Sequence, residues 1–202
     1  MELTEEDKRT LVRIARNAIR RAVNGYGSAS ASDAEDCGQQ PGTCSQRLSE
    51  TLSARRGAFV TLTLGDQLRG CIGNVEPDTP LAETVAAVAA QAAGEDPRFP
   101  PVTPEELHRL DFEVSVLSPF RVLESIEEFR LGIDGLMLLH GYRKGLLLPQ
   151  VGRRTGMTRE VFLEALCKKA QISTAALQDP DTTLYAFTAE VIENREYGSQ
   201  HV

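Results

Sequence analysis

Two alternating stretches that lie three residues apart constrain the fold of this chain most. In residues 57–64, GAFVTLTL, apolar side chains occupy every second position, and residues 68–73, LRGCIG, continue the pattern. A gap this short predicts an antiparallel hairpin, because parallel strands need a crossover of about a dozen residues or more. For the two apolar faces to coincide, Leu64 should pair with Leu68, which leaves a three-residue loop of Gly65, Asp66 and Gln67.

The rest of the sequence predicts an α+β fold with a mostly antiparallel sheet and packed helices. Helical spacing and capping signals predict three main helices, at residues 4–23, 80–93 and 158–170. Alternation predicts a strand at 110–118, a second hairpin turning at about Gly141 to Lys144, and one closing strand at 183–193. Two hairpins among alternating helices and strands favour α+β layers. We expect a single domain over residues 1–202, with a helix within 1–23 and a mobile loop at 24–47.

Composition disfavours several classes of function. The net charge of −7 and the absence of tryptophan argue against a nucleic-acid partner. No stretch is apolar enough to cross a membrane and the N-terminal residues are acidic, so we expect a cytoplasmic protein without a membrane partner. The four cysteines form no CxxC pair and there are three histidines, which predicts no metal site, and nothing indicates a cofactor. Cys37 and Cys44 should stay reduced in a cytoplasm.

The LRGCIG stretch is the first candidate for chemistry. As a strand, it places Arg69 and Cys71 on one face, roughly 6–7 Å apart along the backbone. A guanidinium near a thiol favours the reactive thiolate. Gly70 and Gly73 would leave the flanking backbone open to a ligand. The alternative is an inert thiol buried in the core, which is the commoner state of a free cysteine.

Polar residues of the neighbouring strands would converge on Cys71 if these strands are adjacent in one sheet. They are Thr61, Thr63, Glu113 and Ser115. Glu113 could then act as a general base or pair with Arg69, and its alternative role is that of an ordinary carboxylate on a solvated strand face. No histidine has an evident place beside Cys71, so a cysteine–histidine couple is not supported.

Six motifs in order resemble those of the AMMECR domain family. They are GAFVTL, LRGCIG, EDPRFPP, EVSVL, GLLLPQV and FLEALCKKA, and the similarity covers about residues 55–193. The resemblance implies an α+β fold of a larger and a smaller subdomain, with motif residues lining a cleft between them. It also implies component A of the AmmeMemoRadiSam system, with a Memo-type protein and a radical S-adenosylmethionine (radical-SAM) protein as partners. A small molecule or peptide would be the ligand of that cleft.

Matching the motifs residue by residue marks a set of candidate site positions. The matched positions include the three candidate catalytic residues, Cys71, Arg69 and Glu113, and the resemblance adds as candidate binding residues Gly70, Gly73, Asp96, Arg98, Phe99, Pro149 and Gln150. The chain departs from the family pattern where Asp134 replaces a common histidine and where Met157 replaces the tryptophan of a GW pair. Whether an activity is shared depends on whether those two positions serve a site or only packing.

Two functions remain open at this stage. The first is a non-catalytic binding or accessory module that works with the Memo-type and radical-SAM proteins, with Arg69 as an anchor for an anion. The alternative is an enzyme, or an enzyme component, that uses Cys71 as nucleophile or redox thiol with help from Arg69 and Glu113. We favour the module, because the sequence assembles no complete catalytic set.

Overall fold

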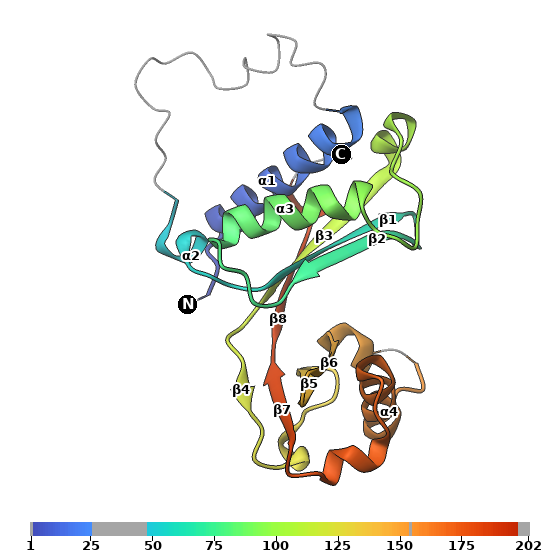
Figure 1. The fold of residues 1–202 in the computed structure, drawn as a ribbon. Helices are drawn as coiled ribbons and strands as arrows, with labels where there is room; N and C mark the ends of the chain where they lie inside the picture. Colours follow the sequence, from blue (N-terminus) through green and yellow to red (C-terminus); the bar gives the residue numbers. More distant parts are fainter. Residues whose placement is uncertain (1, 26–47, 154, 198–202) are drawn as a thin grey trace. The chain divides into compact units, whose positions relative to one another are not determined.

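A computed structural model describes residues 2–25, 48–153 and 155–197 of the chain, which form two compact units (Figure 1). Unit 1 comprises Met1–Val116 together with Val191–Val202, and unit 2 comprises Leu117–Glu190. Unit 2 is therefore inserted, in chain order, into unit 1. Residues 26–47 of the expected loop, with Cys37 and Cys44, lie outside the described residues.

Unit 1 packs helices on one four-stranded sheet. Its main helices are α1 (Glu5–Asn24) and α3 (Leu81–Gly94), with a short α2 (Glu50–Ser53) and the 3-10 helices η1 (Pro104–Arg109) and η5 (Asn194–Tyr197). Thr4 caps α1, because its side chain accepts from the Asp7 N–H while the Asp7 carboxylate accepts from the Thr4 N–H. The strands are β1 (Ala58–Leu64), β2 (Gln67–Asn74), β3 (Leu110–Leu117) and β8 (Ala189–Glu193), in the order β2-β1-β3-β8.

The β1–β2 hairpin has the expected register over most of its length but not the expected loop. Leu62 pairs with Gly70, as the alternation predicts, whereas Leu64 pairs with Gln67 rather than Leu68. The loop has two residues, and Gly65 occupies its first position at a φ of 59°, which suits a type II′ turn. Arg69 is the extra residue of a β-bulge that restores the register. The prediction of a three-residue loop was wrong, because a bulge supplies the odd residue instead.

The two faces of this sheet differ in composition. One face packs against α1 and α3 and forms a core whose members include Val60, Leu62, Val114, Leu11 and Val85. Figure 1 shows both helices on the same side of the sheet. The other face carries the residues between these apolar positions, among them Thr61, Cys71 and Glu113. Strand alternation therefore separates a covered apolar face from a polar one.

Unit 2 packs one helix against a second antiparallel sheet. Its strands are β4 (Arg121–Val122), β5 (Gly135–His140), β6 (Arg143–Leu147) and β7 (Thr182–Phe187), in the order β4-β7-β5-β6. Helix α4 (Arg159–Ala170) is capped by Thr158 and packs on β5 and β6. Three 3-10 helices connect these elements: η2 (Ile126–Glu128), η3 (Pro149–Arg153) and η4 (Thr174–Gln178). The core contains Leu136, Leu138, Phe162, Leu166 and Ala186.

The expected closing strand at 183–193 is two strands. The chain leaves β7 of one sheet at Phe187 and enters β8 of the other at Ala189, so Thr188 separates them. Prediction of one strand was wrong because the alternation of side chains continues through the break. The α+β fold with antiparallel sheets is confirmed. None of the helices in the described part of the chain has the length and apolar character that a bilayer span requires.

Candidate functional site

Cys71 lies on β2, an edge strand, and its side chain is on the polar face of the sheet. It pairs with Thr61 of β1, and its half-buried Sγ lies 3.4 Å from the Thr61 Oγ1. The backbone N–H and C=O of Cys71 point away from β1, toward the open edge of the sheet. Thr61 and Cys71 therefore form the kind of strand pair in which side chains approach most closely. The thiol belongs to a polar row and not to the hydrophobic core.

Asp96 and Arg98 close the edge of β2 at Cys71. The Cys71 N–H donates to Asp96 Oδ2 at 2.8 Å, and Arg98 Nη2 donates to the Cys71 carbonyl at 3.0 Å. Arg98 also donates to both oxygens of Asp96, at 2.9 and 2.7 Å. These two side chains supply the partners that another strand would offer, so this part of the edge is not free to pair with a second chain.

Asp96 and Arg98, which we call the bracket, also interact electrostatically with each other and with Cys71. Hydrogen bonds from Arg98 hold the pKa of the buried Asp96 carboxyl far below its ordinary value, with help from the Cys71 N–H. The pKa of Arg98 is raised, first by Asp96 and to a smaller extent by the Cys71 side chain. The Arg98 guanidinium also lies over the ring of Phe99, 5.5 Å from its centroid. Arg98 is therefore a cation whose pKa depends in part on the Cys71 side chain.

Arg69 holds other parts of unit 1 together. Its Nε and Nη2 donate to the two oxygens of Glu106, at 2.8 and 3.0 Å, and its Nη1 and Nη2 donate to the carbonyls of Pro100 and Pro101. Only 12% of the Arg69 side chain is exposed. The bidentate pair lowers the pKa of Glu106. The structure thus directs this guanidinium to Glu106 and the segment after α3, whereas the strand alternation predicted it beside the thiol.

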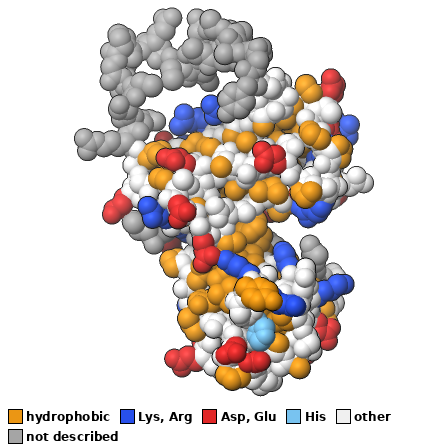
Figure 2. All heavy atoms as spheres, in the orientation of Figure 1, with side chains coloured by type: hydrophobic (Ala, Val, Ile, Leu, Met, Phe, Trp, Pro, Cys, Tyr) orange, Lys and Arg blue, Asp and Glu red, His pale blue; other side chains and the backbone are white. Residues whose placement is uncertain are grey.

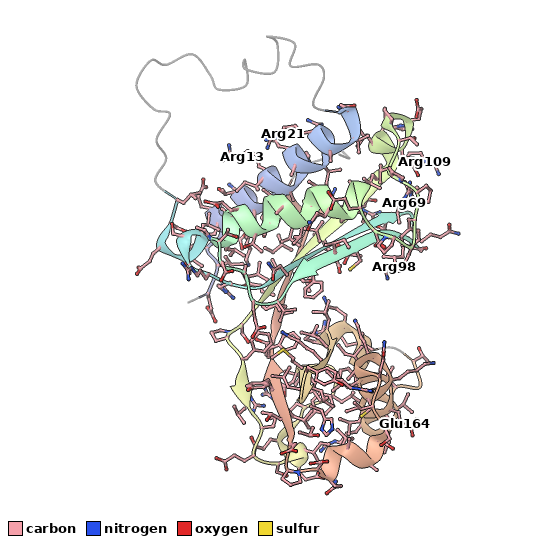
Figure 3. The ribbon with its side chains drawn as sticks, in the orientation of Figure 1. Arg13, Arg21, Arg69, Arg98, Arg109 and Glu164 are labelled. Carbon is pink, nitrogen blue, oxygen red and sulfur yellow. The ribbon has the colours of Figure 1, made fainter. Side chains whose placement is uncertain are left out.

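Figure 3 shows Arg69 and Arg98 at the same end of the sheet, beside the segment that follows α3. That segment carries the EDPRFPP motif, and LRGCIG lies on β2. The two motifs therefore form one structural unit: Asp96 and Arg98 bind the backbone of Cys71, while Pro100 and Pro101 accept from Arg69.

Glu113 and Cys71 flank Thr61 on neighbouring strands. Thr61 pairs with Cys71 on one side and with Glu113 of β3 on the other. Burial raises the pKa of Glu113, the nearby Glu193 adds to this, and a hydrogen bond with Thr61 opposes it. The result is a row of thiol, hydroxyl and carboxyl across three strands, which we call the thiol row (Cys71, Thr61 and Glu113).

Other atoms of the protein occupy the space beside both glycines of LRGCIG. A Cβ at Gly70 would meet the backbone carbonyl of Ala92, so this glycine lets α3 approach β2 closely. A Cβ at Gly73 would meet the ring of Phe59, its partner across the hairpin. Both glycines therefore have a packing reason that does not involve a ligand.

The remaining candidates belong to unit 2. Pro149 is buried and begins η3, and Gln150 follows it and is half-buried. Asp134 is buried, and hydrogen bonds from Arg130 outweigh the effect of burial and lower its pKa. Met157 packs against the core of unit 2. In this chain the two departures from the family pattern thus serve an ion pair and a core contact.

Glu106 is a partner of Arg69 that is not among the candidate residues predicted from the sequence. Thr103 and Glu106 form a capping box, the S/T-x-x-E pattern that is visible in TPEE at 103–106. Glu106 Oε2 accepts from the Thr103 N–H at 2.7 Å and also from Arg69. The capping pattern marks Glu106 as ordered, although nothing in it indicates Arg69. Within the described ranges, no group of three or more potential metal ligands occurs.

Fold and site together define an α+β protein of two antiparallel sheets with a cysteine bracketed at a sheet edge. The AMMECR1 family profile matches residues 12–192, and the chain belongs to this family. The match includes most of α1, whereas the similarity predicted from the sequence motifs began only at about residue 55.

Relatives of similar length come from archaea. A protein of Methanothermobacter thermautotrophicus is 41% identical over 196 residues, covering 94% of this chain and 95% of its own. The protein MK0488 of Methanopyrus kandleri is 39% identical, covering 96% and 92%. The crystal structure of PH0010 from Pyrococcus horikoshii matches with a TM-score of 0.78 at 35% identity, covering 95% of this chain and 93% of that one. These matches extend the likeness to nearly the whole chain.

Proposed function

We propose that this AMMECR1-family protein is a non-catalytic accessory module that works with a Memo-type protein and a radical-SAM protein. The thiol row is the contact point for a small polar molecule or a peptide segment that these partners share with it. The observation that carries the proposal is the row itself. A thiol, a hydroxyl and a carboxyl lie side by side on the sheet face opposite α1 and α3.

The hydrogen bonds of Arg69 support a binding role for the protein over a catalytic one. An enzyme that activates its thiol with Arg69 needs that guanidinium at the sulfur, whereas its hydrogen bonds go to Glu106, Pro100 and Pro101. The bracket of Asp96 and Arg98 fixes the backbone of Cys71 and so the position of the thiol. A preorganised polar row loses little conformational entropy on binding, which favours affinity.

The test measures binding of the full chain to purified Memo-type and radical-SAM proteins by calorimetry. Thr61→Val removes the central hydroxyl at nearly constant volume, and we expect affinity for the partner to fall about tenfold because one hydrogen-bonding group is lost. Thr63→Val is the matched control: the same substitution, two residues along the same face of β1. Equal losses in both variants, or no binding by the wild type, would contradict the proposal.

A second candidate is supported by the geometry of Thr61. Its hydroxyl lies between the Cys71 thiol and the Glu113 carboxyl, whose pKa is raised by burial. In this candidate the thiol gives its proton to the Thr61 hydroxyl, which passes its own proton to the Glu113 carboxylate. A thiolate and a neutral carboxyl remain, with the hydroxyl unchanged. The thiolate then serves as nucleophile.

The pH dependence of alkylation separates the two candidates. For the relay, iodoacetamide should modify Cys71 rapidly at neutral pH, and Glu113→Gln should move the midpoint of the reaction to higher pH because the proton acceptor is lost. For the accessory module, Glu113→Gln should leave the midpoint where it is in the wild type. Thr63→Val serves again as the control, since it keeps all three members of the row.

A further inference from the structure

The outer face of α1 carries four arginines in one row. Arg9, Arg13, Arg16 and Arg20 follow one another at intervals of four, three and four residues, which places them on one side of a helix. With a rise of about 1.5 Å per residue the row is about 16 Å long. The opposite side of the helix is buried, with Leu11, Ala15 and Ala18 among its residues. We call these four residues the arginine row.

The arginine row has few partners within the protein. In the described part of the chain, no hydrogen bond or ion pair involves Arg13, Arg16 or Arg20. Arg9 acts on Glu5 only through its charge, and Glu5 is hydrogen-bonded to Lys8 and Tyr197. Figure 2 shows Lys and Arg side chains gathered over α1 at the top of this view, and Figure 3 shows Arg13 pointing away from the sheet.

Arg16 makes the row more than a solvated surface. This side chain is half-buried, and its Nε and Nη2 atoms are shielded from water without an acceptor among the described residues. Burial lowers the pKa of Arg16, and the charge of Arg20 lowers it further. A shielded donor without a partner costs about 1–3 kcal/mol. A carboxylate of a partner reaches these nitrogens only when the Arg16 side chain turns outward, and its two oxygen atoms then satisfy both of them.

We propose that the arginine row is a docking surface for an acidic helical segment of a partner protein. Guanidinium groups bind carboxylates through two parallel hydrogen bonds. A helix with glutamates at intervals of four, three and four residues presents its carboxylates over the same length of about 16 Å. The row lies on α1, on the covered side of the sheet, and the thiol row lies on the other face. This inference is therefore independent of the proposed function.

Other anionic partners fit the row less well. A long nucleic acid would extend past the arginine row by more than one Debye length, roughly 8 Å. Its outer phosphates would then face a protein with a net charge of −7, which disfavours binding. α1 contains no aromatic residue on which a base could stack. A membrane-surface helix needs apolar side chains free to enter the lipid, whereas those of α1 are in the core of unit 1.

The experiment uses two synthetic peptides and the full chain. Both peptides are helical, rich in alanine and glutamine, and contain four glutamates. In one, the glutamates have the intervals four, three and four, and in its isomer they are dispersed around the helix. Fluorescence anisotropy at low ionic strength should show binding of the spaced peptide at least about tenfold tighter than that of the isomer, because only one face offers four pairs. Equal binding of both peptides would overturn the proposal.

Charge reversal at one position tests the row directly. Arg13→Glu should weaken binding of the spaced peptide about tenfold. Arg21→Glu is the matched control, because Arg21 is exposed on the same helix but lies outside the intervals of the row and hydrogen-bonds the Asn17 carbonyl of its own helix. Equal weakening in both variants would contradict the proposal, as would tighter binding of a deoxythymidine 20-mer or of phosphatidylserine vesicles. Cys71→Ser should leave peptide binding unchanged, which separates this test from that of the proposed function.

Arg16→Met provides a second readout. Methionine keeps an apolar stem and removes the donors that lack a partner, so the free protein should melt about 2–4 °C higher while peptide binding weakens. A lower melting temperature would mean that the guanidinium already has a partner within the chain, and the proposal would fall.

Discussion

The two sheets each end in an edge strand that packs on a helix, β2 on α3 and β6 on α4. Both strands contain a glycine at the contact. A Cβ at Gly70 would meet the Ala92 carbonyl of α3, and a Cβ at Gly145 would meet the Leu166 carbonyl of α4. The same device thus occurs in both units. A glycine within a strand of this protein marks the close approach of a helix and does not by itself mark a ligand site.

The cysteine beside each contact is where the two regions differ. Cys71 lies on β2 itself, half-buried on the polar face, with Thr61, Asp96 and Arg98 around it. Cys167 lies on α4 in the core of unit 2, and burial raises its pKa. The polar bracket around the first cysteine, rather than the glycine, distinguishes a candidate site from plain packing.

Alkylation should show the largest difference between the two regions. In a Cys37→Ser/Cys44→Ser background, iodoacetamide should modify Cys71 about a thousandfold faster than Cys167, because a core thiol reacts only after the structure opens. Peptide mass mapping over time gives both rates from one sample. Rates within a factor of ten of each other would remove the distinction between a polar and a core thiol.

Substitution of the glycines tests what the two regions share. Gly70→Val and Gly145→Val should each lower the free energy of unfolding by about 3 kcal/mol, since the helix backbone leaves no room for the side chain. Urea titration followed by circular dichroism measures the effect. Gly94→Ala is the control, because no atom beyond its own stretch of α3 lies within 4 Å of the added Cβ. If only one valine variant is destabilised, the two contacts are not equivalent.

The smallest effect concerns the bracket that only β2 has. Asp96→Asn should lower the free energy of unfolding by about 2 kcal/mol at pH 7, because the charged hydrogen bonds to Arg98 are lost. The folded pKa of Asp96 lies below its ordinary value of 3.8. The contribution is therefore complete well above pH 3.8 and is lost as the pH falls below it, so the two proteins should converge in acid.

Urea titrations of wild type and Asp96→Asn between pH 7 and pH 2 measure this convergence. Asp78→Asn is the control, since Asp78 is an exposed acid of the same unit. A deficit that stays constant over this range would show that Asp96 acts through packing and not through its charge.

Local pattern was sufficient for the faces of the β1–β2 hairpin. Alternation alone predicts that Leu62 pairs with Gly70, and the structure confirms it. The turn escaped prediction, because a two-residue loop plus a bulge at Arg69 preserves the same parity as a three-residue loop. Likewise, alternation continues across Thr188, so the pattern cannot reveal that β7 and β8 belong to different sheets.

The candidate site depended on contacts that are distant in sequence. Arg69 and Cys71 are two residues apart, and from this spacing the guanidinium was expected beside the thiol. The position of the guanidinium is set by its hydrogen-bond acceptors, which belong to Pro100, Pro101 and Glu106. The glycines are similar, because the reason for Gly70 is a carbonyl on α3. Strand parity places a side chain on a face, whereas its hydrogen bonds depend on which segments the fold brings to that face.

The order of segments along the chain has a consequence for synthesis on the ribosome. β3 and β8 are neighbours in one sheet, yet all of unit 2 is translated between them. Unit 2 of the nascent polypeptide can therefore fold before β8, the last strand of unit 1, has left the exit tunnel. The body that holds the thiol row therefore acquires its final strand last.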